Sequence, residues 1–342
     1  MSGNTAAHSE GKRFTGGTVF LSVFNFVLNF CLQVGIALLL VFLHHRGNGA
    51  FSAYVTDNLP VLFFALACTF LLDWIIYLFY FFDERKFLTE MKNVWLIFLI
   101  MDVGVLVSGA MSFLTGYVYL RPMALVALLV LFLVNYRSAV FLNTVFSLQM
   151  FLFDVLTKYD EYMGAVNNEM LCSLMLCFIG GMFALFFGKS VKTRSGVLST
   201  GALVAIPAVI IILLLQISDY NHFMTSVGNA LMQVAAGIGG SMLSAVLFFA
   251  FLPIFEKMFS VLTPFRLREL TGSDAKLLKR LKEEAPGTFN HSMIVAQLVE
   301  SCASALGEDV ELARAAAYYH DVGKLRQPEF FTENQGGHNL HD

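Results

Sequence analysis

The sequence predicts an all-α protein in two parts: a polytopic bundle of about eight membrane-spanning helices, and a shorter, more polar helical segment after it. Three observations lead to this prediction. Apolar residues make up 57% of the chain and charged residues only 14%, whereas about a quarter of a soluble domain is charged. The apolar residues gather in eight runs between residues 18 and 255, and each run has at least about the 20 residues that span a bilayer, the last being longer than one span requires. Beyond them, residues 273–342 show helical periodicity and contain two histidines and an aspartate in a pattern typical of metal ligands.

The composition also argues against several classes of protein. The net charge of −3 comes with no long basic tract, so a nucleic acid polymer is not an expected partner. The five cysteines are scattered and form no Cys-x-x-Cys pair, which argues against a zinc ribbon and against a disulfide scaffold. No phosphate-binding loop or dinucleotide fingerprint occurs.

The bundle is expected to cover residues 18–255 and to follow a cytoplasmic tail of residues 1–17. Lys12 and Arg13 precede the first apolar run, 18–43, as they would in a signal sequence. That run is longer than the roughly 7–15 residues of a cleavable core, so we predict a retained span. The seven further runs are, in order, 59–82, 94–115, 117–134, 138–157, 170–188, 197–217 and 223–255.

The basic residues between the runs predict the orientation. With the N-terminus inside, twelve basic residues fall on the cytoplasmic side: Lys12, Arg13, Arg85, Lys86, Lys92, Arg137, Lys189, Lys192, Arg194, Lys257, Arg266 and Arg268. Three fall in outside loops: Arg46, Arg121 and Lys158. This positive-inside bias predicts that both termini are cytoplasmic, and we expect a multi-pass protein of the cell (inner) membrane, surrounded by lipid.

Two features of the spans have more than one interpretation. Asp73 and Asp102 lie within apolar runs at similar predicted depths, and they indicate either an ion or proton path or carboxyl groups that simply face the bundle. The last span is rich in small residues, which indicates close packing in the bundle centre or at a homodimer face. Those residues are Gly228, Ala235, Ala236, Gly237, Gly239, Gly240 and Ser244.

After the spans, residues 256–272 are expected to form a juxtamembrane connector. One helix is predicted to end at Pro286-Gly287, and the next to run from about His291 to Leu306. A helix from Asp309 to about Tyr319 then leads to His320 and Asp321. Because His291 shares the helical face of Ile294 and Leu298, we expect it to point inward. Ligands from two packed helices can therefore meet, and imidazole with carboxylate suits Mn, Fe or Zn.

The order of several short motifs makes this region more specific than a His-Asp pair alone. The motifs are Leu277-Leu278-Lys279-Arg280-Leu281, Ala285-Pro286-Gly287-Thr288-Phe289-Asn290-His291-Ser292, Ala317-Tyr318-Tyr319-His320-Asp321-Val322-Gly323-Lys324 and Glu333-Asn334-Gln335. They closely resemble the start of the HD domain in membrane-bound HD phosphodiesterases of the PgpH type, over roughly Glu269 to Asp342. The resemblance implies that residues 273–342 are the N-terminal part of a cytoplasmic HD domain. It also implies cyclic di-AMP as substrate and a linear dinucleotide as product.

The resemblance assigns roles to four residues. His291, His320 and Asp321 would be metal ligands, with Asp321 bridging two Mn or Fe ions and so acting as a catalytic residue. Lys324 would approach a phosphate oxygen, although a solvated lysine at a helix end is an equal alternative. The family also has a large extracytoplasmic domain after its first span, whereas only residues 44–58 lie there in this chain.

Three protein ligands do not hold two metal ions, so the HD domain is expected to be incomplete in residues 273–342. The family takes further ligands from downstream helices, and His341-Asp342 resembles a connector rather than a second metal motif. We therefore expect residues 1–342 to show no phosphodiesterase activity and to bind at most one metal ion weakly. The alternative function is a non-catalytic membrane receptor or transport-like bundle with a vestigial HD segment.

Overall fold

The computed structural model describes residues 16–45, 50–83, 88, 90–158, 168–218 and 227–335. The expected tail of residues 1–17 and the His341-Asp342 pair fall largely or wholly outside these ranges. Within them all regular structure is helical, which confirms the all-α prediction. The chain divides into a larger unit, Met1–Val261, and a C-terminal unit, Leu262–Asp342.

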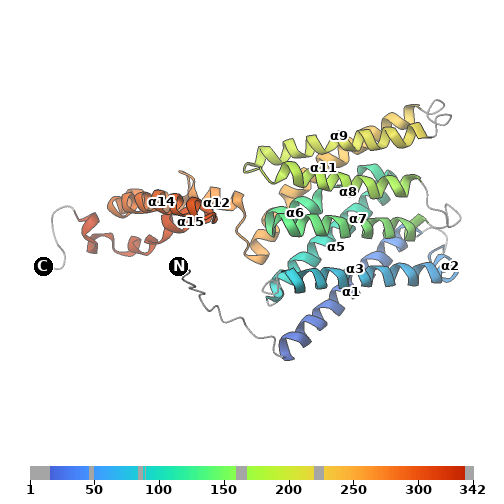
Figure 1. Ribbon diagram of the computed structural model, residues 1–342, viewed down its shortest axis with the longest axis horizontal. Coiled ribbons are helices and arrows are strands. Elements are labelled where there is room, and N and C mark those ends of the chain that lie inside the picture. Colours follow the sequence, from blue (N-terminus) through green and yellow to red (C-terminus); the bar gives the residue numbers. More distant parts are fainter. Residues whose placement is uncertain are drawn as a thin grey trace, which may run out of the picture. The chain divides into compact units, whose positions relative to one another are not determined.

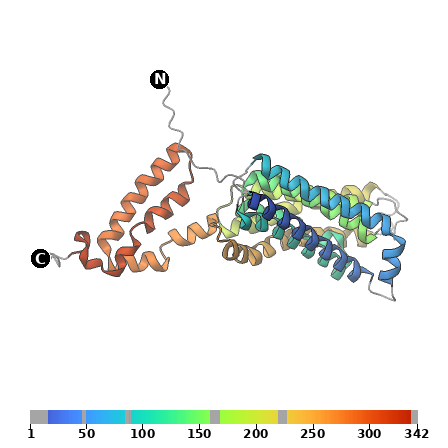
Figure 2. The same ribbon diagram turned by 90° about the horizontal axis from the view of Figure 1, so that it is seen from below.

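The larger unit is a bundle of long helices that lie side by side (Figure 1, Figure 2). Seven of its described helices are long and apolar enough to cross a membrane, which confirms a multi-pass membrane protein. Its elements are α1 (Gly16–His44), α2 (Ala50–Asp57), α3 (Leu59–Asp83), α5 (Met91–Thr115), η1 (Val118–Leu120), α6 (Leu125–Leu133), α7 (Tyr136–Lys158), α8 (Asn168–Gly188), α9 (Arg194–Ser218) and α11 (Val227–Phe259).

The run 117–134 differs from the full span that the sequence predicts. It forms the short 3-10 turn η1 and then α6, which has only nine residues. Arg121 is extended because it precedes Pro122, and an extended residue cannot continue a helix. α6 itself is almost completely buried, and a Cβ on Gly104 of α5 would overlap Val126 of α6. This segment is therefore the innermost part of the bundle and has little surface to offer lipid.

Contacts at one end of the bundle show which helix ends lie together. Asp83 at the end of α3 pairs with Arg137 at the start of α7. Lys189 at the end of α8 lies over the ring of Tyr136, 5.9 Å from its centroid. Gly201, early in α9, packs against Ala245, late in α11. The end of α11 therefore lies at the bundle end where α7 and α9 begin.

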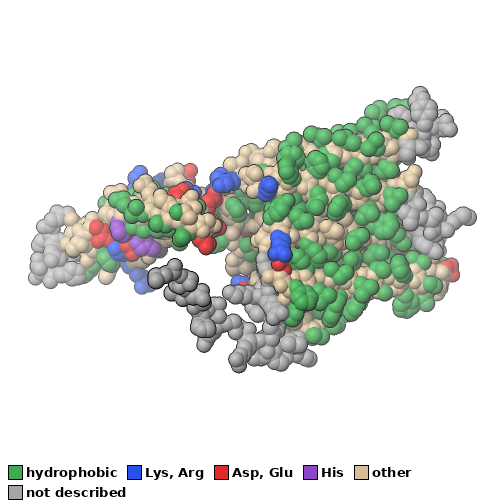
Figure 3. Space-filling model, in the orientation of Figure 1, with side chains coloured by type: hydrophobic (Ala, Val, Ile, Leu, Met, Phe, Trp, Pro, Cys, Tyr) green, Lys and Arg blue, Asp and Glu red, His purple; other side chains and the backbone are tan. Residues whose placement is uncertain are grey.

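The outer surface of the larger unit is apolar, which is the reverse of a soluble protein. Figure 3 shows hydrophobic side chains over most of the face that it presents. Large side chains such as Phe63, Phe64 and Phe82 are exposed on α3. Apolar side chains on the outside of a helical bundle are stable in lipid, where the backbone polar groups are satisfied within each helix.

The small residues of α11 pack inside the bundle, as one of the two interpretations expected. A Cβ on Gly237 would lie 2.5 Å from Ile212 of α9, and a Cβ on Gly240 would lie 2.5 Å from the carbonyl oxygen of Arg121. The hydroxyl of Ser244 accepts a hydrogen bond from the Ala124 backbone N–H at 3.2 Å. Close backbone approach is the use of small residues that membrane helices commonly show.

The C-terminal unit is also helical, and its helix ends follow local signals. Thr263 and Asp309 accept hydrogen bonds from the first turns of α12 and α15, and Gly307 ends α14 with φ +74°. The elements are α12 (Pro264–Thr271), α13 (Lys276–Glu284), α14 (Pro286–Leu306), α15 (Val310–Tyr319), η3 (Val322–Arg326), η4 (Pro328–Phe330) and η5 (Thr332–Asn334).

The start of α14 corrects one prediction. Pro286 begins this helix instead of ending the one before it, so α14 starts five residues earlier than expected. Proline suits the first helical position because its missing N–H would have no partner within the helix there. His291 consequently lies in the second turn of α14 rather than at its start.

Candidate metal centre

The ends of two packed helices bring the three predicted ligand residues together. His291 lies on α14, while His320 and Asp321 directly follow α15. One ligand atom from each residue lies within 4.8 Å of the other two, and the two imidazole rings have centroids 5.6 Å apart. In the described part of the chain, this is the one group of three or more His, Cys, Asp or Glu side chains close enough to hold a metal ion.

A backbone contact fixes the tautomer of His320. Its Nδ1 lies 2.7 Å from the carbonyl oxygen of Ala317, and a carbonyl only accepts, so Nδ1 carries the proton. The lone pair of the neutral ring is therefore on Nε2, which lies 3.3 Å from Asp321 Oδ2. Two acceptor atoms at this separation repel each other unless a proton or a cation lies between them. This donor pair fits a divalent cation, and a backbone-held second nitrogen is typical of metal-ligating histidine.

Lys324 connects Asp321 to a second carboxylate. Its Nζ lies 2.9 Å from Asp321 Oδ2 and 2.6 Å from Glu333 Oε1, and 4.9 Å from the ring centroid of Phe331. These hydrogen bonds, first that to Glu333, raise the pKa of Lys324 above its ordinary value. The bond from Lys324 likewise lowers the pKa of Glu333. Lys324 is thus a partly exposed cation that two carboxylates hold in place.

Glu333 and Asn334 in turn hold the start of α14 through Thr288, and we call these three residues the Thr288 clasp. The backbone N–H of Thr288 donates to Asn334 Oδ1 at 3.0 Å, and Asn334 Nδ2 donates to Thr288 Oγ1 at 2.8 Å. The Thr288 hydroxyl donates to Glu333 Oε1 at 3.1 Å. Asn334 therefore satisfies a first-turn N–H that α14 cannot satisfy itself, one turn before His291.

Glu333 and Asn334 belong to one of the motifs that carry the family resemblance, but the sequence alone predicts no role for either residue. Their partner lies 45 and 46 positions away, and no local spacing indicates such a contact. The usable signal was chemical: a Glu-Asn pair after a lysine-bearing turn offers both a carboxylate and a capping amide. The three predicted ligands carry a stronger signal because two of them are adjacent in sequence.

The helical face that carries His291 is exposed, which contradicts the expectation that it points inward. Ile294 and Leu298 on that face are 60% and 63% exposed, and His291 itself is exposed. The periodicity correctly placed the three residues on one face. No other described helix of the C-terminal unit covers that face, and Leu312 of α15 is exposed as well. The exposed apolar residues there agree with the expectation of an uncovered HD core.

Comparisons with known proteins agree with the family resemblance. The family described as "7TM receptor with intracellular HD hydrolase" matches residues 58–263, and the HD domain family matches residues 288–342. A protein of Bacillus subtilis (strain 168) named cyclic-di-AMP phosphodiesterase PgpH is 32% identical over 269 residues, which cover 75% of this chain and 36% of that protein. The protein of the same name in Listeria monocytogenes is 32% identical over 225 residues, 66% of this chain and 30% of that protein.

An uncharacterized protein of Synechocystis is 52% identical over 91 residues, 26% of this chain and 11% of that protein. No solved structure matches. The chain spans about a third of the length of the two PgpH proteins. The first family covers more than half of the chain, and the HD family covers the residues that bring the candidate ligands together. The chain therefore belongs to the family of seven-transmembrane receptors with an intracellular HD hydrolase.

Proposed function

We propose that this protein is a membrane-anchored, metal-dependent phosphodiesterase of the HD superfamily that hydrolyses cyclic di-AMP to a linear dinucleotide. The convergence of His291, His320 and Asp321 within 4.8 Å is the observation that carries the proposal. The substrate rests on the names of the two PgpH relatives.

In this proposal His291, His320 and Asp321 bind a divalent ion, Mn or Fe, and Asp321 is the ligand that a second ion would share. Such an ion would supply Lewis-acid stabilisation of the charge that develops on a phosphate during hydrolysis. Three ligands hold one ion, so the second requires ligands from outside the described residues. For this reason we expect residues 1–342 to bind one Mn ion weakly and to show no turnover.

Lys324 is proposed to contact a phosphate oxygen of the substrate. An ammonium group has three N–H donors, and the hydrogen bonds to Asp321 and Glu333 use two of them. The third is available to a phosphate oxygen without breaking either bond. Glu333 and Asp321 hold the Lys324 side chain in place, so the cation is oriented before the substrate binds.

The orientation in the membrane and the domain limits belong to the proposal as well. Residues 18–255 would form the transmembrane bundle between a tail, 1–17, and a connector, 256–272, with 273–342 in the cytoplasm. Six described basic residues support a cytoplasmic location for the end of the bundle where α7 begins and α11 ends: Lys92, Arg137, Lys189, Lys192, Arg194 and Lys257.

Of the glycines of α11 that a homodimer face could use, Gly228 in the first turn is the one left open. Gly237 and Gly240 already contact other segments of the same bundle, whereas a Cβ on Gly228 meets no atom within 4 Å.

A chimera tests the enzymatic proposal directly. Residues 58–335 of this chain would replace their counterpart in the Bacillus subtilis relative, so that the relative supplies any remaining ligands. With Mn²⁺ and cyclic di-AMP, a chromatographic assay should detect the linear product. Replacing His320-Asp321 by Ala-Ala should abolish this product, and retained hydrolysis would refute the assignment. In residues 1–342 alone, turnover that His291→Ala abolishes would show that three ligands suffice.

A further inference from the structure

Polar side chains from four helices gather at one place in the apolar interior of the larger unit. They are Gln33 of α1, Asp73 of α3, Asp102 of α5 and Gln149 of α7. Asp73 is 0% exposed and Asp102 is 3% exposed, and they lie close enough for their charges to interact. The similar depths that the sequence predicts for the two carboxyl groups therefore bring them into one cluster.

Most polar atoms of this cluster have no hydrogen-bond partner. Gln149 Nε2 donates to Asp73 Oδ1 across 3.4 Å, which is a long bond. By hydrogen-bond geometry, both oxygens of Asp102, both polar atoms of Gln33, Asp73 Oδ2 and Gln149 Oε1 are buried without a partner, and the Gln33 amide lies close enough to Asp73 and Asp102 to interact with both. Buried polar groups are normally paired, and nothing in hydrocarbon can satisfy them. So many unpaired acceptors on one small surface indicate a ligand that is a donor or a cation.

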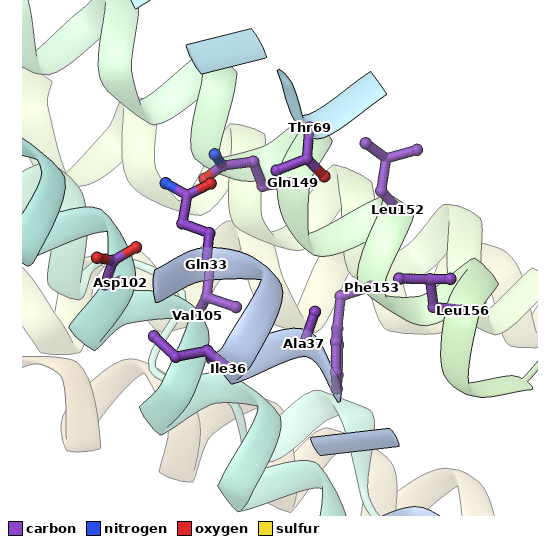
Figure 4. Close-up of a pocket in the computed structure, with 10 residues that line it drawn as sticks. All are labelled: Gln33, Ile36, Ala37, Thr69, Asp102, Val105, Gln149, Leu152, Phe153 and Leu156. Carbon is purple, nitrogen blue, oxygen red and sulfur yellow. The ribbon is translucent and has the colours of Figure 1, made fainter. Parts of the chain in front are cut away.

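Three of these residues, Gln33, Asp102 and Gln149, line a cavity between the helices (Figure 4). Its volume is about 40 Å³, and its polar lining consists of Gln33, Thr69, Asp102 and Gln149. One water molecule requires about 10–15 Å³ by the same kind of measure, so a small cation with accompanying water fits. The rest of the lining is apolar and includes Ile36 and Phe153, so bulk water does not fully solvate the carboxylate.

No basic side chain neutralises the carboxylates. Among the described residues, Arg121 is the one buried basic side chain, and it pairs with Asp154 and donates to Ser173. The titratable groups at the cluster are Asp73 and Asp102, together with Tyr77, whose hydroxyl donates to the Ser22 carbonyl at 3.3 Å. A buried carboxylate without a counter-charge is unstable. A protonated Asp102 that is hydrogen-bonded to the Gln33 side chain is the alternative to a bound cation.

We propose that this cavity binds a Na⁺ ion, with Asp102 as the charged ligand and Gln33 and Gln149 as neutral oxygen ligands. All the available ligand atoms are oxygens, which suit a hard cation. Only one of the two carboxylates lines the cavity, so the charge of the lining matches a monovalent ion. Asp73 lies outside the lining, orients the Gln149 amide by accepting its hydrogen bond, and carries a proton in the Na⁺-bound state, so a single carboxylate charge faces the ion. All residues of this site belong to the helical bundle, so the proposed Na⁺ binding does not depend on the proposed phosphodiesterase activity.

The test uses the full chain in lipid nanodiscs at pH 8. Thermal unfolding is followed in NaCl and in choline chloride at equal ionic strength, and ²²Na⁺ binding is measured on the same samples. We expect Na⁺ to raise the unfolding midpoint by about 3 °C or more and to bind at one ion per chain. Equal midpoints in the two salts, together with no ²²Na⁺ binding, would overturn the proposal.

Matched variants locate the ion. Asp102→Asn should abolish both the ²²Na⁺ binding and the Na⁺-dependent shift. Asp83→Asn makes the same change at the end of α3, where Asp83 pairs with Arg137, and should retain both. Undiminished binding in Asp102→Asn would refute the site. The proposal would also be refuted if the unmodified chain binds no ²²Na⁺ and Asp102→Asn is stabler than it in both salts. That result would mean that Asp102 is a protonated carboxyl and not an ion ligand.

Two further variants keep the test decisive if Asp102→Asn does not fold. Gln33→Ala and Gln149→Leu each remove one neutral ligand and leave both carboxylates in place. Each should weaken ²²Na⁺ affinity about tenfold or more, because a cation in a confined site depends on the protein oxygens that replace part of its water shell. Unchanged affinity in both variants would contradict the proposal.

Discussion

Gly287 lies where the Thr288 clasp meets the start of α14, and its replacement by alanine should destabilise the C-terminal unit. A Cβ at this position would overlap the backbone carbonyl oxygen of Glu333 and would lie 2.9 Å from Asn334 Oδ1. Real Cβ atoms essentially never approach another heavy atom within 3.0 Å. The obstacle is backbone, so a side-chain rotation cannot relieve it. The segment after η4 must move away from α14 by about 1 Å.

That displacement sets the magnitude of the effect. The three hydrogen bonds of the clasp are 2.8–3.1 Å long, and an added 1 Å takes each of them beyond hydrogen-bonding distance. Each contributes about 1 kcal/mol, and the one to the Glu333 carboxylate somewhat more. Alanine regains roughly 0.5–1 kcal/mol over glycine in a helix. The net loss for Gly287→Ala is therefore about 2–3 kcal/mol, whereas helix propensity alone predicts a gain.

Hydrogen exchange in the full chain measures this loss locally. Protected amides in the peptides of α14 and of residues 322–335 should exchange about 30- to 150-fold faster in Gly287→Ala. Gly323→Ala is the matched control, because a Cβ there meets no atom within 4 Å, and exchange should change little. If Gly287→Ala exchanges as slowly as Gly323→Ala, the clasp does not hold α14 and the reasoning is wrong.

Three further predictions concern other contacts. Arg121→Met leaves the Asp154 carboxylate buried without a partner and should lower the free energy of unfolding by about 3–5 kcal/mol. Adding Asp154→Leu to the same chain should restore most of this loss, and thermal unfolding of the single and double variants measures both effects. Lys324 lowers the pKa of Glu333, so the pair stabilises the C-terminal unit when the pH is above 4.5, the ordinary glutamate pKa. The stabilisation is lost as the pH falls below 4.5 and Glu333 takes up a proton. Glu333→Gln should therefore make the stability of this unit depend less on pH below 4.5. Gly240→Ala places a Cβ 2.5 Å from a backbone carbonyl oxygen and should lower the yield of folded bundle in detergent, and an unchanged yield would contradict the close approach of α11.

The length and position of the spans could be predicted because an apolar run is a local property. The predicted run 170–188 corresponds to α8, and the run 197–217 to α9, within three residues at either end. Run length did not reveal that 117–134 is broken, because the whole stretch is apolar apart from Arg121-Pro122. The sequence indicates where a chain can cross a bilayer more reliably than whether it does so as one helix.

Charged residues were harder to place than apolar ones. Arg121 was counted among the outside-loop charges, yet the structure buries it to 1% exposure against Asp154 and Ser173. Its partners lie 33 and 52 positions away, and a loop charge and a buried ion pair look alike in one sequence. The depth of Asp73 and Asp102 in the bundle was predictable from helix length. Gln33 and Gln149 could not be predicted as their neighbours, because a single uncharged glutamine within an apolar run gives no sign of which helix it faces.

The candidate metal centre depends on polar backbone and side-chain contacts more than on burial. His291 is exposed, and the apolar residues on its helical face are exposed with it, so no enclosing core fixes its position. What holds the ligands is the clasp at the start of α14, the Ala317 carbonyl behind His320, and the lysine between Asp321 and Glu333. A site built this way keeps its three ligands together in water, but it does not exclude water from them. Electrostatic stabilisation of a reacting phosphate is far stronger in a dry site, so the proposed hydrolysis requires this exposed face to be covered.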